Sequence, residues 1–372
     1  MRIAHVVRQY HPSVGGMEDV VRNIARHQLE SGHSPTVVTL DRVFRDDDRA
    51  LPPDEEVDGV PVRRLSFRGP SRYPLCPQVL GALDGTDLIH VHGVDFFFDY
   101  LAATRWFHRR PMIASTHGGF FHTRYAEQLK RVFFHTVTRS SVRAYDRIIA
   151  TSDNDGRMFG AIVGHGRLEV IENGVNVRKF RGRAATRAAP VMIYFGRWSE
   201  NKGIPQAIEL LGRLRAREPD WRLIVAGREF DLDLAELRAI VAAHGLDGAV
   251  ELVANPGDAE LAELIGRASY FVCLSRHEGF GLAAIEALSA GLIPVVSDIP
   301  PFRSLVVRSG LGVLAGAGAE DTVSAWFFAS RQGDAATWSA NRERAIRFAD
   351  SYDWQRVAGR YLQVYDELEN RQ

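Results

Sequence analysis

Two acids in the second half of the chain are placed to bind the polar groups of a substrate. Glu278 and Glu286 both lie in the segment SRHEGFGLAAIEALSAGLIPVVSD. Between the first acid and the helical stretch that carries the second stand Gly279, Phe280, Gly281 and Leu282. Backbone amides at such a helix start can bind phosphate or sugar oxygens, and a carboxylate about one and a half turns further can accept hydrogen bonds from a ribose diol. The alternative, an ordinary helix residue at Glu286, is disfavoured by the apolar run LAAIEALSA around it, where an unpaired carboxylate would be costly.

A pair of cations precedes these acids. Arg197 and Lys202 stand in YFGRWSENKG, a stretch typical of a strand, a turn and the start of a helix. Two cations beside a helix N-terminus suit a diphosphate, because they stabilise the charge that accumulates on a departing nucleotide. The alternative is a basic turn exposed to solvent.

The first half of the chain offers a glycine-rich turn and a histidine. Gly15 and Gly16, in QYHPSVGGMEDVV, enter a helical stretch and would let backbone amides approach an anion there. Their spacing is not that of the dinucleotide fingerprint, and a tight βα turn needs glycine in any case. His117 follows the apolar run PMIAST, so we expect it at the carboxyl end of a strand, where an imidazole can orient a sugar hydroxyl. His122 is a weaker candidate in the same loop, and a structural role is the alternative for both.

The sequence predicts no metal site. Asp231 and Asp233 form an Asp-x-Asp, but they precede a helical stretch, where acids are favoured by the helix dipole. The acidic run from Asp46 to Asp48 is predicted to be a charged surface loop. The two cysteines, Cys76 and Cys273, lie far apart without metal-ligand spacing, and Cys273 is expected in a buried strand.

The elements that position these residues follow from the hydrophobic pattern. Short apolar runs alternate with longer stretches of helical period, which predicts an α/β chain with two doubly wound domains. We expect one domain over residues 1–175, a second over 176–351, and a final helix over 352–372 that packs back onto the first. The Arg/Ala-rich segment 181–190 is predicted to be the linker. Ligands bind beyond the carboxyl ends of strands in such sheets, so we expect the active site in a cleft between the domains.

Composition narrows the classes of partner. Lys+Arg and Asp+Glu both number 46, which argues against a nucleic-acid binder that depends on bulk charge. No apolar run approaches the roughly 20 residues that a membrane-spanning helix needs, and the N-terminus is typical of a first strand and not of a signal peptide. A cytoplasmic location is therefore expected.

The glycine loop, the R-x(4)-K pair and the E-x(7)-E element together resemble the retaining glycosyltransferases of family 4. That resemblance implies the GT-B fold, in which two Rossmann-like domains face a central cleft, and a reaction that needs no metal. It implies that Glu286 binds the ribose of a nucleotide sugar and that Glu278 contacts the transferred sugar. Arg197 and Lys202 would hold the diphosphate, and His117 would face the reacting sugar.

Within that family, the segments HVVRQYHPSVGGMEDVV, STHGGFFHT and SRHEGFG are similar to bacterial exopolysaccharide α-1,3-mannosyltransferases that act on cellobiosyl-diphosphopolyprenol, of the xanthan and acetan type. The narrower similarity implies GDP-mannose as donor, a polyprenyl-diphosphate-linked oligosaccharide as acceptor, and a peripheral place on the inner face of the cell membrane. The alternatives are a family-4 transferase with a UDP-sugar donor and a noncatalytic sugar-nucleotide-binding module.

Two stretches of the first domain are predicted to contact that membrane, since basic amphipathic helices can lie in a lipid interface. One stretch, 124–143, carries Arg124, Lys130, Arg131, Arg139 and Arg143 with Phe133 and Phe134 between them. The other, 95–111, combines Phe96, Phe97, Phe98, Trp106 and Phe107 with Arg105, Arg109 and Arg110. The alternative is that the aromatic rings face the core and the arginines face solvent.

Overall fold

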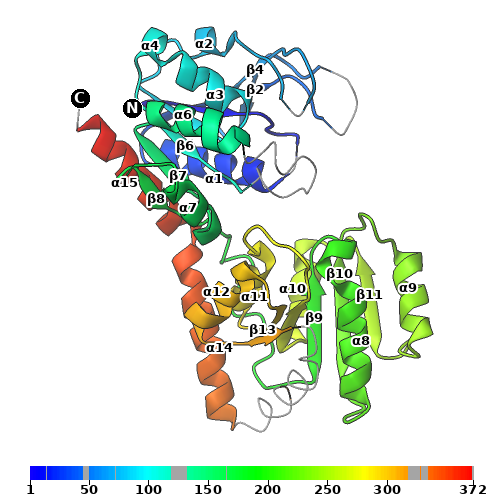
Figure 1. Ribbon diagram of the computed structural model, residues 1–372. Coiled ribbons are helices and arrows are strands. Elements are labelled where there is room, and N and C mark those ends of the chain that lie inside the picture. The colour runs from blue at the N-terminus through cyan, green and yellow to red at the C-terminus, as the bar shows by residue number, and fades with distance from the viewer. Residues whose placement is uncertain are drawn as a thin grey trace. The chain divides into compact units, whose positions relative to one another are not determined.

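The chain forms two compact units, each built around one sheet (Figure 1). The computed structural model describes residues 1–13, 15–44, 50–71, 73–118, 132–164, 166–316, 327 and 334–370. Unit 1 comprises Met1–Gly174 and Trp354–Gln372, and unit 2 comprises Val175–Asp353. Each unit is described by itself.

The sheet of unit 1 has eight strands in the order β3-β4-β2-β1-β5-β6-β7-β8. Its neighbouring strands are parallel except for the β3–β4 hairpin. The strands are β1 (Arg2–Val7), β2 (Ser34–Leu40), β3 (Asp54–Val57), β4 (Val60–Leu65), β5 (Leu88–His92), β6 (Met112–Ser115), β7 (Arg147–Ala150) and β8 (Leu168–Val170). The central strands are buried on both faces, as parallel sheets require.

Helices cover both faces of this sheet. They are α1 (Gly16–Glu30), α2 (Val79–Ala82), α3 (Phe96–Ala103), α4 (Arg105–His108), α6 (Arg139–Ser141), α7 (Asp153–Gly160) and α15 (Trp354–Glu369), with short turns η1 (Phe134–Thr138) and η2 (Val142–Ala144). The C-terminal helix α15 belongs to unit 1, where Tyr361 and Tyr365 share a buried cluster with Ile24 of α1. The opposite face is covered by a second cluster that contains Phe97 and Phe98 of α3.

Unit 2 has a six-stranded parallel sheet in the order β11-β10-β9-β12-β13-β14. The strands are β9 (Val191–Phe195), β10 (Arg222–Gly227), β11 (Val250–Ala254), β12 (Tyr270–Cys273), β13 (Ile293–Ser297) and β14 (Val313–Ala315). The order reverses between β9 and β12, which places the connections on opposite faces when each crossover is right-handed. Cys273 is buried in β12, as expected.

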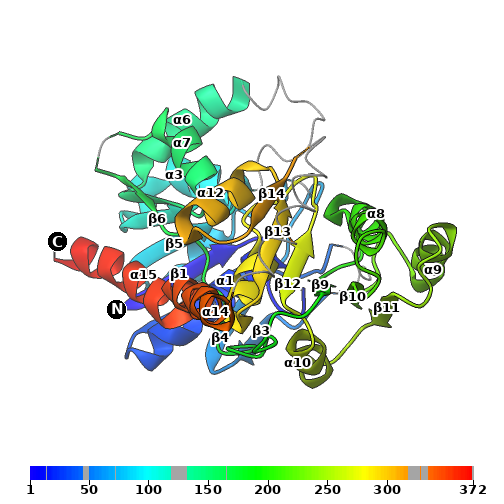
Figure 2. The same cartoon turned by 90° about the horizontal axis from the view of Figure 1, so that it is seen from below.

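The helices of unit 2 follow from this topology. They are α8 (Ile204–Arg215), α9 (Leu234–Ala243), α10 (Asp258–Gly266), α11 (Leu282–Ala290), α12 (Pro300–Ser309) and α14 (Ala335–Ala349), with short turns η3 (Glu200–Lys202) and η4 (Asp350–Tyr352). Figure 2 shows α8 and α10 on opposite sides of the strands. The helix α14 packs against α11 and α12.

The linker prediction for residues 181–190 was wrong. Phe180 and Ala184 are buried in the core of unit 2, and the backbone N–H groups of Gly182 and Ala184 donate to the carbonyls of Ser289 and Ala290. The Arg/Ala-rich segment 181–190 is therefore a part of unit 2 that is hydrogen-bonded to it. The first division between the units falls at Gly174–Val175.

Candidate active site

The structure brings together two predicted site residues, Lys202 and Glu278. The Lys202 ammonium lies 2.7 Å from a carboxylate oxygen of Glu278, and the Ser275 hydroxyl donates to the same oxygen at 2.6 Å. Their side chains are 21% and 11% exposed, so the pair is largely withdrawn from water yet remains accessible. Such a pair holds a cation at a fixed position beside the surface.

The pair forms because two loops at neighbouring strand ends are bonded to each other. Lys202 ends the turn after β9, and Glu278 lies after β12, which pairs with β9. The Arg276 N–H donates to the Asn201 carbonyl at 2.9 Å, and the Asn201 amide donates to the His277 carbonyl at 2.7 Å. Gly203 allows this approach: its φ is +69°, and a Cβ there would overlap the Leu274 carbonyl.

Two helix N-termini start beside this pair. α8 begins after Gly203 and α11 after Gly281, and neither has a side-chain cap or an acid in its first turn. Their first N–H groups are thus left to a ligand or solvent, and their dipoles favour an anion. Phe280 and Leu282 flank Gly281, and the Phe280 ring packs edge-on against Tyr352 with centroids 5.7 Å apart.

Arg197 and Glu286 occupy the positions that their sequence context indicates. Arg197 is exposed after β9, with its guanidinium 5.1 Å from the ring centroid of Phe230. Glu286 is half-buried in α11, the helix that starts after Glu278, Gly279 and Phe280. Among the predicted donor-site residues, the described contacts therefore join Glu278 to Lys202, and Glu286 lies on α11, the helix that follows Glu278.

The remaining predicted residues belong to unit 1. Gly15 and Gly16 start α1, where a side chain at Gly15 would overlap the Glu18 carboxylate, so an acid already stands at this helix start. His117 follows β6 with a φ of +50°, an uncommon backbone conformation for a non-glycine residue. Desolvation lowers the pKa of His117 to about 3, which keeps its imidazole neutral near pH 7. His122 lies outside the described residues.

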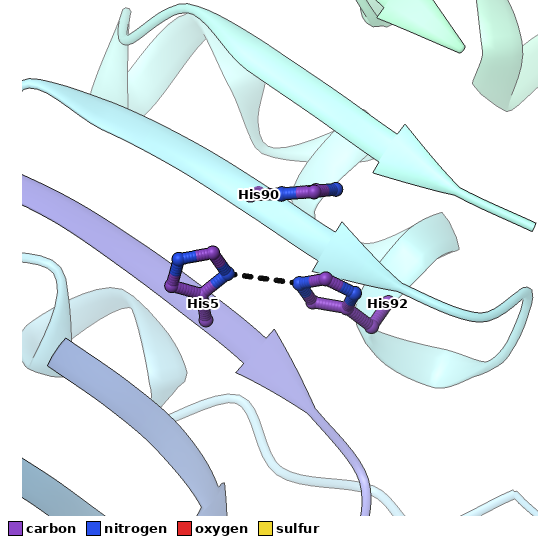
Figure 3. Close-up of side chains that lie close together, drawn as sticks. All are labelled: His5, His90 and His92. Atoms are coloured by element: carbon purple, nitrogen blue, oxygen red, sulfur yellow. Dashed lines mark hydrogen bonds between the residues drawn. The ribbon is translucent and has the colours of Figure 1, made fainter. Parts of the chain in front are cut away.

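Three buried histidines of unit 1, one of which contacts His117, were missed by the sequence analysis. His5 lies on β1 and His90 and His92 lie on β5, and one ring nitrogen from each falls within 4.8 Å of the others (Figure 3). A signal was present, because HVV and LIHVH place polar histidines inside strands that otherwise read as buried. Alternation along β5 turns His90 and His92 to one face.

The acids of the Asp-x-Asp are engaged locally. Asp233 caps α9 in a capping box with Glu236, as its position before the helix predicted. Asp231 accepts hydrogen bonds from the Ser199 hydroxyl and the Glu200 N–H, at 3.0 Å and 2.9 Å. The run Asp46 to Asp48 lies outside the described residues.

A pocket of about 420 Å³ in unit 2 adjoins the site without including it. Ser275 and Arg276 line it, together with residues of α8 and of the loop after β13. No predicted donor-binding residue lines this pocket, so we place the site by its charged groups and helix ends.

The structure divides the two predicted membrane-contact stretches. Phe96, Phe97 and Phe98 are core residues, exposed by 9% or less, so their assignment to a surface was wrong. The helix that carries them, α3, packs against β5 and α6. Phe134 is likewise buried, at 2%. Trp106 and Phe107 are 67% and 63% exposed.

The basic residues of these stretches divide in a similar way. Arg139 and Arg143 are exposed, whereas Arg105 pairs with Asp146 at 2.9 Å. Arg124, Lys130 and Arg131 lie outside the described residues. No helix among the described residues is both long and apolar enough to cross a bilayer.

Comparisons with known proteins agree with this architecture. Residues 14–179 match the family described as glycosyltransferase family 4, and residues 178–325 match glycosyl transferases group 1. Anabaena HepE, solved with UDP, superposes with a TM-score of 0.76 at 18% identity and covers 99% of this chain and 100% of its own. Sucrose-phosphate synthase from Thermosynechococcus elongatus gives 0.72 at 19% identity over all of both chains. These structural likenesses support the GT-B fold.

Curated relatives are much closer in sequence. The GDP-mannose:cellobiosyl-diphosphopolyprenol alpha-mannosyltransferase of Xanthomonas campestris is 50% identical over 370 residues, covering 98% of this chain and 96% of its own. The protein of the same name from Komagataeibacter xylinus is 44% identical over 375 residues, covering 100% and 94%. The chain therefore belongs to glycosyltransferase family 4, with the GT-B fold, and within it to the group of these α-mannosyltransferases.

Proposed function

We propose that this enzyme transfers mannose from GDP-mannose to cellobiosyl-diphosphopolyprenol with retention of the α-configuration. The observation that carries the proposal is 50% identity, over 98% of the chain, to the Xanthomonas campestris enzyme of that name. The site of unit 2 supports it, because a cation and two uncapped helix N-termini suit the diphosphate of a nucleotide sugar.

Each site residue has a task in this proposal. Lys202 and Arg197 stabilise the charge on the leaving diphosphate, so no metal ion is required. Glu286 accepts hydrogen bonds from the ribose diol, and Glu278 accepts them from hydroxyls of the transferred sugar. The acceptor hydroxyl attacks from the face that the diphosphate leaves, and a leaving phosphate oxygen takes its proton.

Thermal unfolding with candidate ligands tests the donor assignment. A ligand that binds only the folded chain stabilises it by RT ln(1 + [L]/Kd), or about 2.7 kcal/mol at 100 times Kd. We expect GDP and GDP-mannose to raise the melting temperature in EDTA, and UDP-glucose to raise it less. Glu286→Gln should reduce the GDP effect, whereas Glu343→Gln, an exposed acid on α14, should not. A response to UDP-glucose alone, or one that requires a divalent metal, would overturn the assignment.

Peripheral membrane docking of unit 1 is the second part of the proposal. Trp106 and Phe107 stack at 3.6 Å between ring centroids and are largely exposed. Arg109 follows them on the same exposed segment, and Arg139 and Arg143 are exposed on the turns after η1. Aromatic rings beside arginines suit the interface of an anionic bilayer, where the lipid-linked acceptor resides.

Liposome flotation tests the docking surface. Binding should require anionic lipid, weaken at high salt, and fall both in Trp106→Ser/Phe107→Ser and in Arg139→Glu/Arg143→Glu. The matched control is Val307→Ser, because Val307 is 73% exposed on α12 in the other unit. Equal binding by all four proteins, or binding that ignores lipid charge, would contradict docking through this surface.

A further inference from the structure

Two of the three buried histidines of unit 1, His5 and His92, belong to a chain of hydrogen bonds that reaches His117. His5 lies 2.9 Å from His92 between Nδ1 and Nε2, as Figure 3 shows, and His92 lies 2.9 Å from His117 between Nδ1 and Nε2. At the other end, the Nε2 atom of His5 lies 2.7 Å from the Oε1 atom of Gln28 on α1. This chain of hydrogen bonds thus runs from α1, which carries Gln28, to the carboxyl end of β6, where His117 lies.

Burial keeps the histidines of this chain neutral. His5 and His92 have 0% exposure, and desolvation lowers the pKa of His5 to about 4 and that of His92 well below its usual value. A neutral imidazole has one N–H donor and one acceptor nitrogen. Each bond in the chain therefore fixes the direction of the next.

In the structure the Gln28 amide oxygen faces His5 and can only accept, while the buried amide nitrogen makes no hydrogen bond to the described residues; this orientation sets the direction of the chain. His5 must then donate from Nε2 and accept at Nδ1, so His92 donates to it from Nε2. His92 accepts in turn at Nδ1, and His117 must donate to it from Nε2. We propose that Gln28, His5 and His92 are positioning residues that hold His117 in the Nε2–H tautomer, with Nδ1 as a hydrogen-bond acceptor.

The use of that acceptor rests on the proposed function. A sugar hydroxyl can donate to an unprotonated Nδ1, whereas a protonated Nδ1 would need an acceptor on the substrate. Rotating the Gln28 amide by half a turn would reverse every bond and present an N–H at His117 instead. The orientation of the buried Gln28 amide therefore decides whether Nδ1 of His117 accepts or donates a hydrogen bond.

A metal ion held by His5, His90 and His92 is the competing explanation of the cluster. The ring nitrogens of His90 already lie 2.7 Å from the Tyr365 hydroxyl and 2.8 Å from the Ser115 hydroxyl. The lone pairs of His5 and His92 accept hydrogen bonds within the chain. A cation would have to displace these partners, so the distances favour a hydrogen-bond chain.

Long-range ¹H–¹⁵N spectra of the full chain, labelled at histidine, measure the tautomers directly. The resonances of His5, His92 and His117 are assigned by single substitutions to Asn. In the wild type we expect all three to carry the proton on Nε2 near pH 7.5. A protonated Nδ1 on His117 of the wild type would overturn the proposal.

Gln28→Met tests whether the amide sets the direction, because methionine has a similar shape but provides no comparable acceptor. We expect His117 to lose its single tautomer in this variant, while Gln206→Met, on α8 of unit 2, leaves it intact. Unchanged tautomers in Gln28→Met, or one equivalent of bound transition metal in the wild type that disappears in His90→Gln, would also overturn it.

Sugar transfer separates this inference from the proposed function. We expect Gln28→Met to lower the rate of mannosyl transfer at least tenfold when both proteins are assayed well below the melting temperature of the variant, because the variant leaves the buried His5 N–H without its acceptor and is itself less stable. A changed tautomer with an unchanged rate would overturn the role of His117 Nδ1 in the reaction. Absence of mannosyl transfer in the wild type, with the tautomers as expected, would count against the proposed function alone.

Discussion

The contact between Lys202 and Glu278 would hold a cation ready for the donor phosphate of the proposed reaction. The ammonium lies 2.7 Å from a carboxylate that also accepts a hydrogen bond from Ser275, so both side chains have a defined position before any ligand binds. An ammonium has three donors and can bind a phosphate oxygen while it keeps Glu278. Preorganisation of this kind reduces the reorganisation needed as charge develops on the leaving group.

Removal of the ammonium should therefore slow turnover while the fold survives. We expect Lys202→Ala to lose about 2 to 4 kcal/mol of transition-state stabilisation, which is roughly thirtyfold to a thousandfold in kcat/KM. The control is Arg267→Ala, which removes a cation from the exposed pair with Glu251. Steady-state kinetics of both variants measure the effect. Near-native turnover by Lys202→Ala would show that Lys202 does not take part in the reaction.

At the level of helices and strands, the site depends on which strands are neighbours. β9 pairs with β12, although β10 and β11 lie between them in sequence, and this pairing brings the loop of Lys202 to that of Glu278. In the same way β1 pairs with β5 and brings His5 to His92.

The sequence predicted which strands and helices carry the candidate donor-site residues, but it did not predict the contacts between these residues. The alternation of strands and helices, and the place of Glu278 and Lys202 on loops after strands, could be read from local patterns. Their pairing could not, because it depends on a crossover that spacing does not reveal. The arginine- and alanine-rich segment 181–190 was wrongly predicted to be a linker for a related reason, since its hydrogen bonds go to residues about a hundred positions away.

Substitution of Gly203, with Gly245 as the comparison, tests whether the close approach of the Lys202 turn to Leu274 matters. Gly203 and Gly245 have φ of +69° and +64°, but only Gly203 has a backbone atom where a Cβ would stand. Gly245→Ala should cost about 1 to 2 kcal/mol of unfolding free energy from backbone strain alone. Gly203→Ala should cost more and should also lower activity, because it pushes the Lys202 turn from Leu274. Urea unfolding and turnover of both variants give the comparison, and equal losses would show that the contact with Leu274 does not matter.

For the whole molecule, the neutral histidines of unit 1 make stability depend on pH. The pKa values of His5 and His117 are lowered to about 4 and about 3, from an ordinary value near 6.5. At pH values between the lowered pKa of each histidine and its ordinary value near 6.5, the unfolded chain binds a proton that the folded chain does not bind. Their stabilising contribution is therefore complete above pH 6.5 and declines as the pH falls. Asp95 acts oppositely, since burial raises its pKa to about 6 and the folded chain takes up that proton first.

The unfolding free energy should accordingly fall between pH 7 and pH 5. Each histidine that stays neutral in the folded chain contributes about 1.4 kcal/mol per pH unit below its unfolded pKa. Urea unfolding at the two pH values measures the loss, and His5→Asn should show a smaller loss than the wild type because one such group is gone. A loss of the same size in both proteins would indicate that His5 titrates normally.

The central claim is mannosyl transfer with retention, and NMR of the reaction product tests it most directly. Purified enzyme is incubated in EDTA with GDP-mannose and cellobiosyl-diphosphopolyprenol, and the new anomeric centre is examined after release of the trisaccharide from the lipid. The account predicts one mannose in α-linkage and an equivalent amount of GDP. A β-linked product, or transfer that occurs only from a UDP-sugar, would contradict it.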